Sequence, residues 1–285
     1  SAVSQLIAAL ERAVGMRLVE RPGGPRPVRA TEAGEVLLAH ARAIGARLRA
    51  ARADLASLQE GARGRVLLGG FQSANARILP PLLGRLAVGA PGIEVDSTPE
   101  FADSTLVEHV IAGRLDLAIT VWPLPDGPLA HLHLMRDPCV LLVPAGSPLA
   151  RRRRAELDDL DGLPMVAYRT CMHQIWLEQT LAGMGHTLDI VRRADENAAL
   201  QGMVADGTGA AVVPLLAVNL HDPGVAAVPF GPAMPPRQVV VVWHRDRELG
   251  PAARRVVDVA AEVCAEIELS LALPEGDAGA RSRAG

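Results

Sequence analysis

The chain has 285 residues, of which 49% are apolar, and a formal net charge of −3. This length and composition provide for about two domains with hydrophobic cores, and they exclude a disordered or fibrous protein. No apolar run approaches the roughly 18 residues that cross a bilayer, and three scattered cysteines exclude a disulfide framework. We therefore expect a cytoplasmic globular protein with reduced cysteines, no membrane partner, and no metal or cofactor.

The charge is distributed unevenly along the chain. Residues 1–65 hold eleven Arg and six acidic residues, a surplus of +5, whereas the remainder holds eighteen Arg and twenty-six acidic residues, a balance of −8. A basic N-terminal segment on an acidic body is typical of a DNA-binding segment joined to a regulatory domain.

The first predicted element is a short helix that ends at Gly15. Its apolar residues recur at three- and four-residue steps, which predicts one buried face; they are Val3, Ile7, Leu10 and Val14. Ser4 and Gln5 lie off this stripe. After a short extended piece at 16–20, residues 22–27 read Pro-Gly-Gly-Pro-Arg-Pro, which can form neither a helix nor a central strand. A helix followed by a basic loop indicates a winged DNA-binding element.

The spacing S-x-x-I-x-x-L-E-x-x-x-G-x-R-L-x-x-R, followed by a basic Gly/Pro stretch and T-E-A-G, closely resembles the second half of the winged helix-turn-helix domain of LysR-type transcriptional regulators. The resemblance implies that 1–14 is the recognition helix and that 22–29 is the wing. Double-stranded DNA would be contacted by Ser1, Ser4, Gln5 and Arg26. The family's first two helices, about thirty residues that back the recognition helix, do not precede Ser1. We therefore interpret the chain as a fragment and expect DNA binding of the complete protein.

A long helix is predicted from Thr31, a good N-cap with Glu32 and Glu35 in the first turn, to about Gly61. One apolar stripe runs along it, comprising Leu37, Leu38, Ala41, Ile44, Leu48, Ala51, Leu55 and Leu58. A solitary helix has nothing to cover such a stripe, so we expect it to pair with a second subunit in a homodimer or homotetramer.

From Arg65 onward, strands and helices alternate. The predicted order is strand 66–70, helix 74–88, strand 93–97, helix 103–113 and strand 115–121, then strand 165–168, helix 172–184, strand 188–192, helix 197–206 and strand 210–213. Two such halves imply two parallel-sheet lobes. Strands 139–144 and 238–244 are long enough to cross between the lobes, and helix 250–271 would return to the first lobe.

This double crossover resembles the type 2 periplasmic-binding-protein fold, which LysR-type regulators use as their effector domain. The fold class expected is α/β, a two-lobed effector domain of that type preceded by a partial winged helix-turn-helix and a long linker helix. The expected domains are 1–30 for DNA binding, 31–63 for the linker helix and hinge, 64–138 for lobe I, 139–240 for lobe II, 241–271 for the return to lobe I, and 272–285 for a disordered tail.

Open parallel sheets bind ligands beyond the carboxyl ends of their strands. On this rule and on the family resemblance, the residues expected to bind an effector are Ser73, Phe101, Thr120, Trp122, Tyr168, Arg169, Thr170 and Asn197. The hydroxyl of Ser73 and the start of helix 74–88 would accept a carboxylate, and Arg169 would suit an acidic ligand. In the alternative interpretation, Ser73 is a plain N-cap and Trp122 covers the end of the lobe.

Other chemistry has weaker support. Cys171 and His173 lack an orienting acid for catalysis, His131 and His133 lack a third metal ligand, and a thiol switch between Cys139 and Cys171 has no visible thiolate-stabilising context. The run 151–154 is four Arg, which we interpret as a solvated surface.

Three functions therefore remain. They are a LysR-type regulator controlled by a small, anionic effector, a solute-binding protein of the same bilobal fold without a DNA-binding role, and a small-molecule enzyme. The N-terminal 63 residues favour the regulator over the solute-binding protein, which would need a secretory signal instead.

Overall fold

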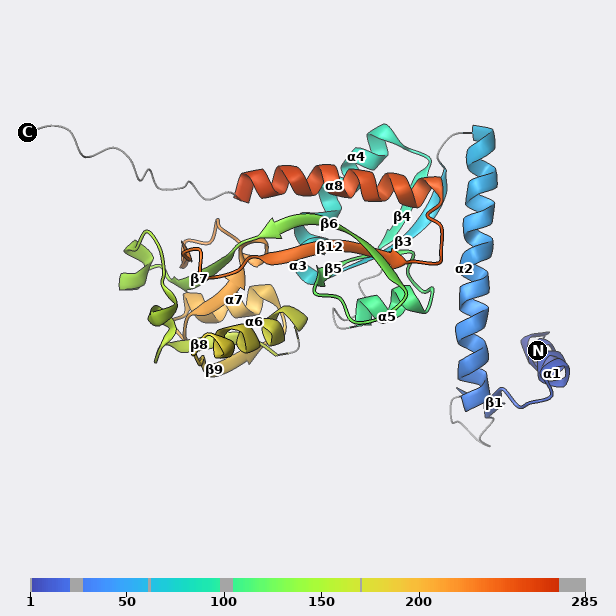
Figure 1. Ribbon diagram of the computed structural model, residues 1–285, viewed down its shortest axis with the longest axis horizontal. Helices are drawn as coiled ribbons and strands as arrows, with labels where there is room; N and C mark the ends of the chain where they lie inside the picture. The colour runs from blue at the N-terminus through green and yellow to red at the C-terminus, as the bar shows by residue number, and fades with distance from the viewer. Residues whose placement is uncertain (1, 21–27, 61–62, 98–104, 170, 272–285) are drawn as a thin grey trace, which may run out of the picture.

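The computed structural model describes residues 2–20, 28–60, 63–97, 105–169 and 171–271, and within 32–60 it leaves aside the side chains of 43, 46–47, 49–50 and 52–60. An N-terminal arm that includes a long upright helix stands beside an elongated, two-lobed body (Figure 1). No helix in the described ranges combines the length and apolarity needed to cross a membrane.

The arm begins with α1 (Ala2–Val14), which ends at Gly15, where a φ of +74° suits glycine. Two short strands, β1 (Val19–Glu20) and β2 (Arg29–Ala30), then pair antiparallel. The Glu11 carboxylate ties α1 to this ribbon, since its Oε1 accepts the N–H of Leu18 at 2.8 Å and that of Val19 at 3.3 Å. Residues 22–27, most of the predicted wing 22–29, lie outside the described residues.

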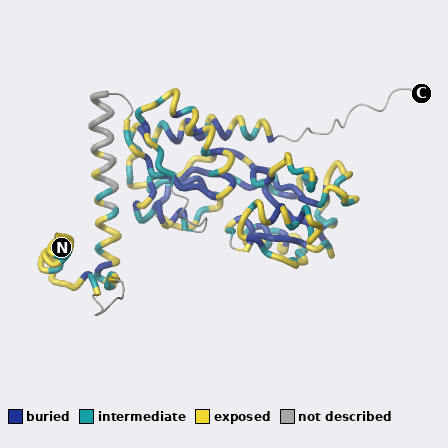
Figure 2. Tube along the Cα trace, turned by 180° about the vertical axis from the view of Figure 1, so that it is seen from behind, coloured by how far each residue is buried: buried dark blue, intermediate teal, exposed yellow. Residues whose placement is uncertain are grey.

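The predicted buried face of α1 is wrong for the described part of the chain, because none of the residues of α1 is buried. Val3 is 64% exposed, Leu10 46% and Val14 43%. Figure 2 shows the same helix as almost entirely exposed. No described segment of this chain covers the apolar stripe.

The linker helix α2 (Glu32–Glu60) begins where the sequence predicts. Thr31 Oγ1 accepts the N–H of Gly34 at 3.0 Å and donates to the carbonyl of Arg17 at 2.7 Å. One hydroxyl therefore both caps α2 and links the start of α2 to the segment that precedes β1. Gly34 permits this close approach, since a Cβ there would lie 2.0 Å from the Leu18 carbonyl oxygen.

Lobe I is built on a five-stranded sheet in the order β4-β3-β5-β12-β6. Its strands are β3 (Gly64–Gly70), β4 (Ile93–Ser97), β5 (Leu117–Trp122), β6 (Leu129–Asp137) and β12 (Arg237–His244). Helices α4 (Leu79–Gly89) and α8 (Pro251–Leu271) cover one face, and the short α5 (Leu106–Ile111) covers the other (Figure 1). The buried apolar residues of these elements form the larger core of the molecule.

Lobe II contains a three-stranded sheet in the order β10-β7-β11 and a parallel pair β8-β9, joined by a bridge between Met165 and Ala210. Its strands are β7 (Cys139–Pro144), β8 (Pro164–Tyr168), β9 (Asp189–Ala194), β10 (Ala211–Pro214) and β11 (Val225–Pro229). Helices α6 (Met172–Gly183) and α7 (Asn197–Ala205) and the 3₁₀ turns η2 (Pro148–Arg151), η3 (Leu157–Leu160) and η4 (Leu215–Ala217) complete the lobe.

The lobes exchange strands at the predicted places, with β7 in the sheet of lobe II and β12 in that of lobe I. The prediction of purely parallel lobes is wrong. β12 runs antiparallel to β5 and β6, and β7 runs antiparallel to β10 and β11. The reason is that each crossover strand enters its sheet from the opposite lobe. The sequence pattern does not predict β6 or β11.

The predicted helix 74–88 is in fact two helices, α3 (Gln72–Arg77) and α4, which meet at Ile78. Pro80 and Pro81 lie in the first turn of α4. Because proline has no N–H, these residues cannot continue the hydrogen-bond ladder of α3, but they are tolerated in the first turn of a new helix.

Candidate effector and DNA sites

The two lobes meet through a direct hydrogen bond. The backbone N–H of Asn197, the first residue of α7 in lobe II, donates to Oε1 of Gln72, the first residue of α3 in lobe I, at 2.7 Å. Glu196, the N-cap residue of α7, provides no side-chain cap. Gln72 therefore satisfies, from the other lobe, a donor that the helix itself leaves open.

Tyr168 extends this contact within lobe II. Its hydroxyl donates to Oδ1 of Asn197 at 2.7 Å. The carbonyl of Tyr168 accepts from Nη1 of Arg193 at 2.8 Å, which holds the end of β8 in place. Two of the residues predicted to bind an effector, Tyr168 and Asn197, thus lie together, and Asn197 contacts the start of α3.

Ser73, also predicted to bind an effector, follows Gln72 and is 3% exposed. Its Oγ accepts from Nη2 of Arg237 at 3.0 Å. The same guanidinium binds Oδ2 of Asp137 at 2.5 Å and lies over the ring of Phe71, 4.5 Å from its centroid. Asp137 in turn accepts the N–H of Leu216 in lobe II at 3.0 Å.

The network of Ser73, Arg237, Asp137 and Leu216 is buried, and it lies where β6 ends and β12 begins. Asp137, the last residue of β6, is 0% exposed, and Arg237, the first of β12, is 6% exposed. A buried ion pair is tolerated only when further hydrogen bonds satisfy both groups, and here Ser73 and Leu216 provide them. Since these two partners belong to different lobes, the pair connects α3 to η4.

The remaining predicted effector residues lie apart from this group. Arg169 forms an exposed ion pair with Asp195 at 3.1 Å. Thr120 is buried within β5. Trp122 is 42% exposed and contacts the rings of two histidines of β6, as described below. Phe101 and Thr170 lie outside the described residues.

Sequence reasoning did not single out Gln72 within the cleft-facing stretch expected at 71–75, and it missed Asp137 and Arg237. Both charged residues stand at the ends of strands, and Arg237 directly precedes a predicted crossover strand. Their partnership spans 100 residues of sequence, and the bond from Asn197 to Gln72 spans 125. No local pattern signals contacts of that range.

A buried thiol and imidazole meet in lobe II, and the thiol is protonated there, which is the unreactive form of a cysteine. His173 Nε2 lies 3.6 Å from Sγ of Cys139. Burial, and to a lesser extent Asp137, raises the pKa of Cys139 to about 12, and burial with Arg237 lowers the pKa of His173 to about 3. The pair is neutral at physiological pH, whereas an activated cysteine is a thiolate.

One group in the described residues brings together three side chains that could bind a metal ion, namely Asp158, Asp161 and His186. Asp161 faces Nδ1 of the imidazole at 3.3 Å, whereas Asp158 faces Nε2 at 3.9 Å. Only Asp161 lies within hydrogen-bond distance of the ring, and the two carboxylates lie beside opposite ring nitrogens.

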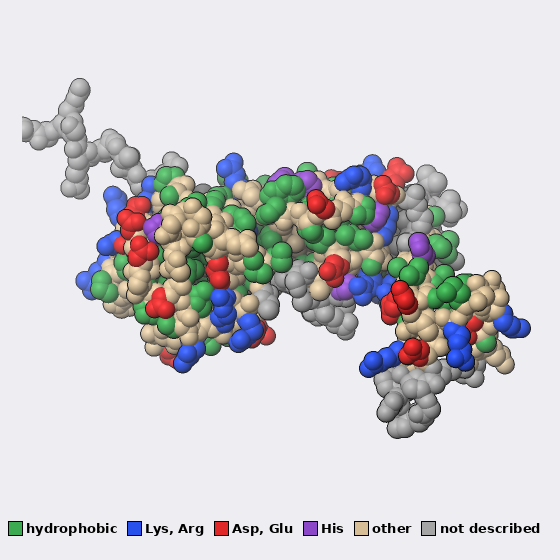
Figure 3. All heavy atoms as spheres, turned by 60° about the horizontal axis from the view of Figure 1, so that its bottom comes forward, with side chains coloured by type: hydrophobic (Ala, Val, Ile, Leu, Met, Phe, Trp, Pro, Cys, Tyr) green, Lys and Arg blue, Asp and Glu red, His purple; other side chains and the backbone are tan. Residues whose placement is uncertain are grey.

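On the arm, the described DNA-binding candidates are Ser4, which is half-buried, and Gln5, which is exposed. Ser1 and Arg26 lie outside the described residues. Arg and apolar side chains are interspersed over the surface of the arm (Figure 3), and exposed Arg residues include Arg12, Arg17 and Arg29. Positive side chains on an exposed helix and ribbon are suited to contacts with phosphate.

Two protein families match the chain. The family described as LysR substrate binding domain matches residues 59–265, and the bacterial regulatory helix-turn-helix protein of the lysR family matches residues 1–35. The SDS degradation transcriptional activation protein of a Pseudomonas species is 30% identical over 260 residues, which cover 88% of this chain and 83% of that protein.

Solved structures agree in fold. A full-length OxyR variant from Pseudomonas aeruginosa has a TM-score of 0.72 at 21% identity, covering 92% of this chain and 84% of that one. The effector binding domain of QuiR in complex with shikimate has a TM-score of 0.64 at 18% identity, covering 72% of this chain and 98% of that one. The match of residues 1–35 removes the alternative of a solute-binding protein without a DNA-binding segment. The arm, the two-lobed body and these matches together show that the chain belongs to the LysR family of DNA-binding transcriptional regulators, with an effector-binding domain behind its helix-turn-helix segment.

Proposed function

We propose that a small carboxylate effector binds where α3 of lobe I faces α7 of lobe II, and that it controls promoter binding by the complete regulator. The observation that carries this proposal is the hydrogen bond from Asn197 to Gln72. It brings Ser73, Tyr168 and Asn197, three residues expected on other grounds to contact the effector, to a common boundary.

The chemistry at this boundary suits a carboxylate. The hydroxyl of Ser73 accepts from Arg237 and so keeps its own proton available to donate. The Asn197 N–H, now bonded to the neutral Gln72 carbonyl, would bind a charged oxygen more strongly. The QuiR effector domain, which shares the fold, is in complex with shikimate, a carboxylic acid. Phe101, Thr120, Trp122, Arg169 and Thr170 remain predictions.

Control of DNA binding would follow from differential affinity. A ligand that touches both lobes stabilises the arrangement in which they lie closest, and it shifts the population by no more than its preference for that arrangement. Helix α2 contacts β3 and α8 of the effector domain, so a movement of lobe I can reach the DNA-binding arm. Ser1, Ser4, Gln5 and Arg26 are the proposed DNA contacts.

We further propose that two or four copies associate through α2 and that the protein acts in the cytoplasm, where promoter DNA is found. Ile44 and Leu48 on α2 are 69% and 53% exposed, which supports a partner helix over this stripe. Enzymatic activity is not part of the proposal, because the relatives are regulators and the buried Cys139–His173 pair is neutral.

The test is thermal or chemical unfolding of the chain with a panel of small carboxylic acids and their amides. The right acid should stabilise the protein by about 2.7 kcal/mol at a hundredfold excess over its dissociation constant. Ser73→Ala and Tyr168→Phe should each remove most of that gain, whereas Ser147→Ala, a serine substitution in a remote cap of lobe II, should not. Equal stabilisation of wild type and Ser73→Ala, or equal stabilisation by acid and amide, would contradict the proposal.

A further inference from the structure

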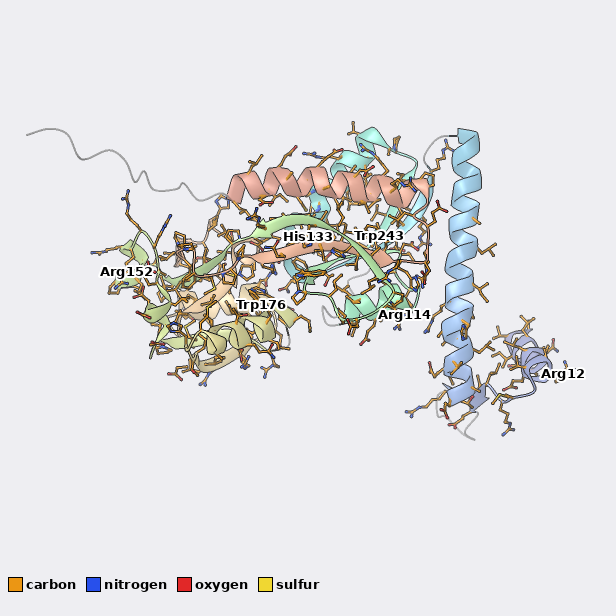
Figure 4. All side chains as sticks on the ribbon, in the orientation of Figure 1. Arg12, Arg114, His133, Arg152, Trp176 and Trp243 are labelled. Atoms are coloured by element: carbon orange, nitrogen blue, oxygen red, sulfur yellow. The ribbon has the colours of Figure 1, made fainter. Side chains whose placement is uncertain are left out.

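We propose that His131 and His133 form a binding site for a divalent transition-metal ion on lobe I. Both residues lie on β6, which is an edge strand of the five-stranded sheet. They pair with Val242 and Val240 of β12, so their side chains project from the same face, and both are exposed. Figure 4 labels His133 on this strand.

The spacing of the two rings suits a shared ion. Their centroids are 5.2 Å apart and the ring planes are inclined by 78°. An imidazole nitrogen binds zinc at about 2.0–2.1 Å, and the ring centroid lies roughly 1 Å further on, so two rings on a tetrahedral ion have centroids about 5 Å apart.

Trp122 packs against both histidines and limits their motion. Its ring centroid is 4.8 Å from that of His131 and 5.6 Å from that of His133. The indole reaches these rings from β5, across β12, which separates the two strands in the sheet. Ordering ligand side chains before binding reduces the entropy that an ion must offset.

The chemistry of the ligands selects the ion. Imidazole favours zinc, copper and nickel over calcium and magnesium, which prefer oxygen, and affinity rises from nickel to copper in the divalent series. With two protein ligands, the other positions would be filled by water. The site would then bind ions more weakly than a closed structural zinc site does, which suits reversible binding.

The Asp158–Asp161–His186 group is the competing site. It lies in lobe II, on η3 and the turn after α6, and it contains no tryptophan. A paramagnetic ion on β6 would quench Trp122 directly, since the indole touches both proposed ligands. The two sites can therefore be distinguished by fluorescence together with substitution.

The experiment titrates Ni²⁺ into the chain and follows tryptophan fluorescence. Wild type should show saturable quenching that is reversed by EDTA and competed by Zn²⁺. His131→Gln and His133→Gln should each raise the apparent dissociation constant by about tenfold or more, since half of the protein ligands are lost. Trp122→Phe should keep binding by calorimetry but lose most of the quenching.

The matched controls are His186→Gln, which removes the competing site, His221→Gln, which removes another exposed imidazole, and Cys171→Ser, which removes a partly exposed thiol. All three should titrate like wild type. The proposal is overturned if wild type shows no saturable binding, if the double variant His131→Gln/His133→Gln binds equally well, or if His186→Gln alone abolishes binding. Circular dichroism of each variant separates loss of the ligand from loss of the fold.

Discussion

The two longest described helices, α2 with 29 residues and α8 with 21, differ in what covers their apolar faces. α8 lies along the sheet of lobe I and buries Ala252, Val256, Val257, Val259, Ala260, Val263, Cys264 and Leu271. On α2, in contrast, Ile44 and Leu48 are 69% and 53% exposed. The stripe of α8 is covered by its own chain and contributes to the stability of one subunit. Ile44 and Leu48 on α2 contribute little burial until another surface covers them.

The sharpest test introduces Asp into the apolar stripe of α8 and, separately, into that of α2. Val259→Asp on α8 puts a carboxylate at a position that is 1% exposed, against the lobe I core. An unpaired buried charge should cost at least about 4 kcal/mol and unfold the effector domain at modest denaturant concentrations. Denaturation followed by circular dichroism measures this loss. A stability within about 1 kcal/mol of wild type would mean that α8 is not held to the sheet as described.

The double variant Ile44→Asp/Leu48→Asp should behave in the opposite way. It adds charge to an exposed stripe, so the folding stability of one subunit should change by no more than about 0.5 kcal/mol per site. Association through α2 should be lost, because pairing would bury both carboxylates. Light scattering should report the mass of a monomer, with Ala39→Asp, exposed and off the stripe, keeping the wild-type mass. An unchanged mass in the double variant would place the interface elsewhere.

The folding stability of the two-lobed body also depends on pH, through His173 in lobe II. Burial, together with Arg237, lowers the pKa of His173 to about 3, whereas an unfolded histidine has a pKa of about 6.5. The unfolded state therefore binds the proton first. Stability is complete above about pH 6.5, declines as the pH falls toward 3, and should be lower by about 2 kcal/mol at pH 5.

His173→Phe keeps a ring beside Trp176, whose centroid is 5.3 Å from that of the imidazole, and removes the titration. Urea unfolding at pH 7.5 and at pH 5 should show a smaller loss for this variant than for wild type. If both lose the same stability between the two pH values, other groups carry the acid sensitivity.

The smallest change in folding stability is expected at the boundary between the lobes, which is neither part of a hydrophobic core nor fully exposed surface. Gln72→Ala removes the acceptor of the Asn197 N–H, and water can replace it at this exposed position. The cost in stability should be about 1 kcal/mol or less. Amide hydrogen exchange at the start of α7 should accelerate, while α6 is unchanged. Equal protection of Asn197 in both proteins would show that the bond does not hold the lobes together.

Sequence reasoning by itself determined the elements whose causes are local. The helix that ends at Gly15, the cap at Thr31 and helix 250–271 follow from φ preferences, capping hydroxyls and apolar periodicity, and each occurs in the structure. The family resemblance extended this to the two-lobed architecture and to a regulatory function. Even among local features, the split of helix 74–88 escaped prediction, although Pro80 and Pro81 are its cause.

Only the tertiary structure decided which polar groups meet. Ser73 accepts a hydrogen bond from a guanidinium 164 residues away, Asp137 and Arg237 are 100 residues apart, and the Asn197 N–H finds its acceptor in the other lobe. The stripe of α1 was predicted to be buried, yet in the described chain none of its residues is buried, and Val3, Leu10 and Val14 are exposed. Periodicity shows that a face is apolar, whereas burial and pairing depend on which distant surface lies against it, and that is a property of the assembled fold.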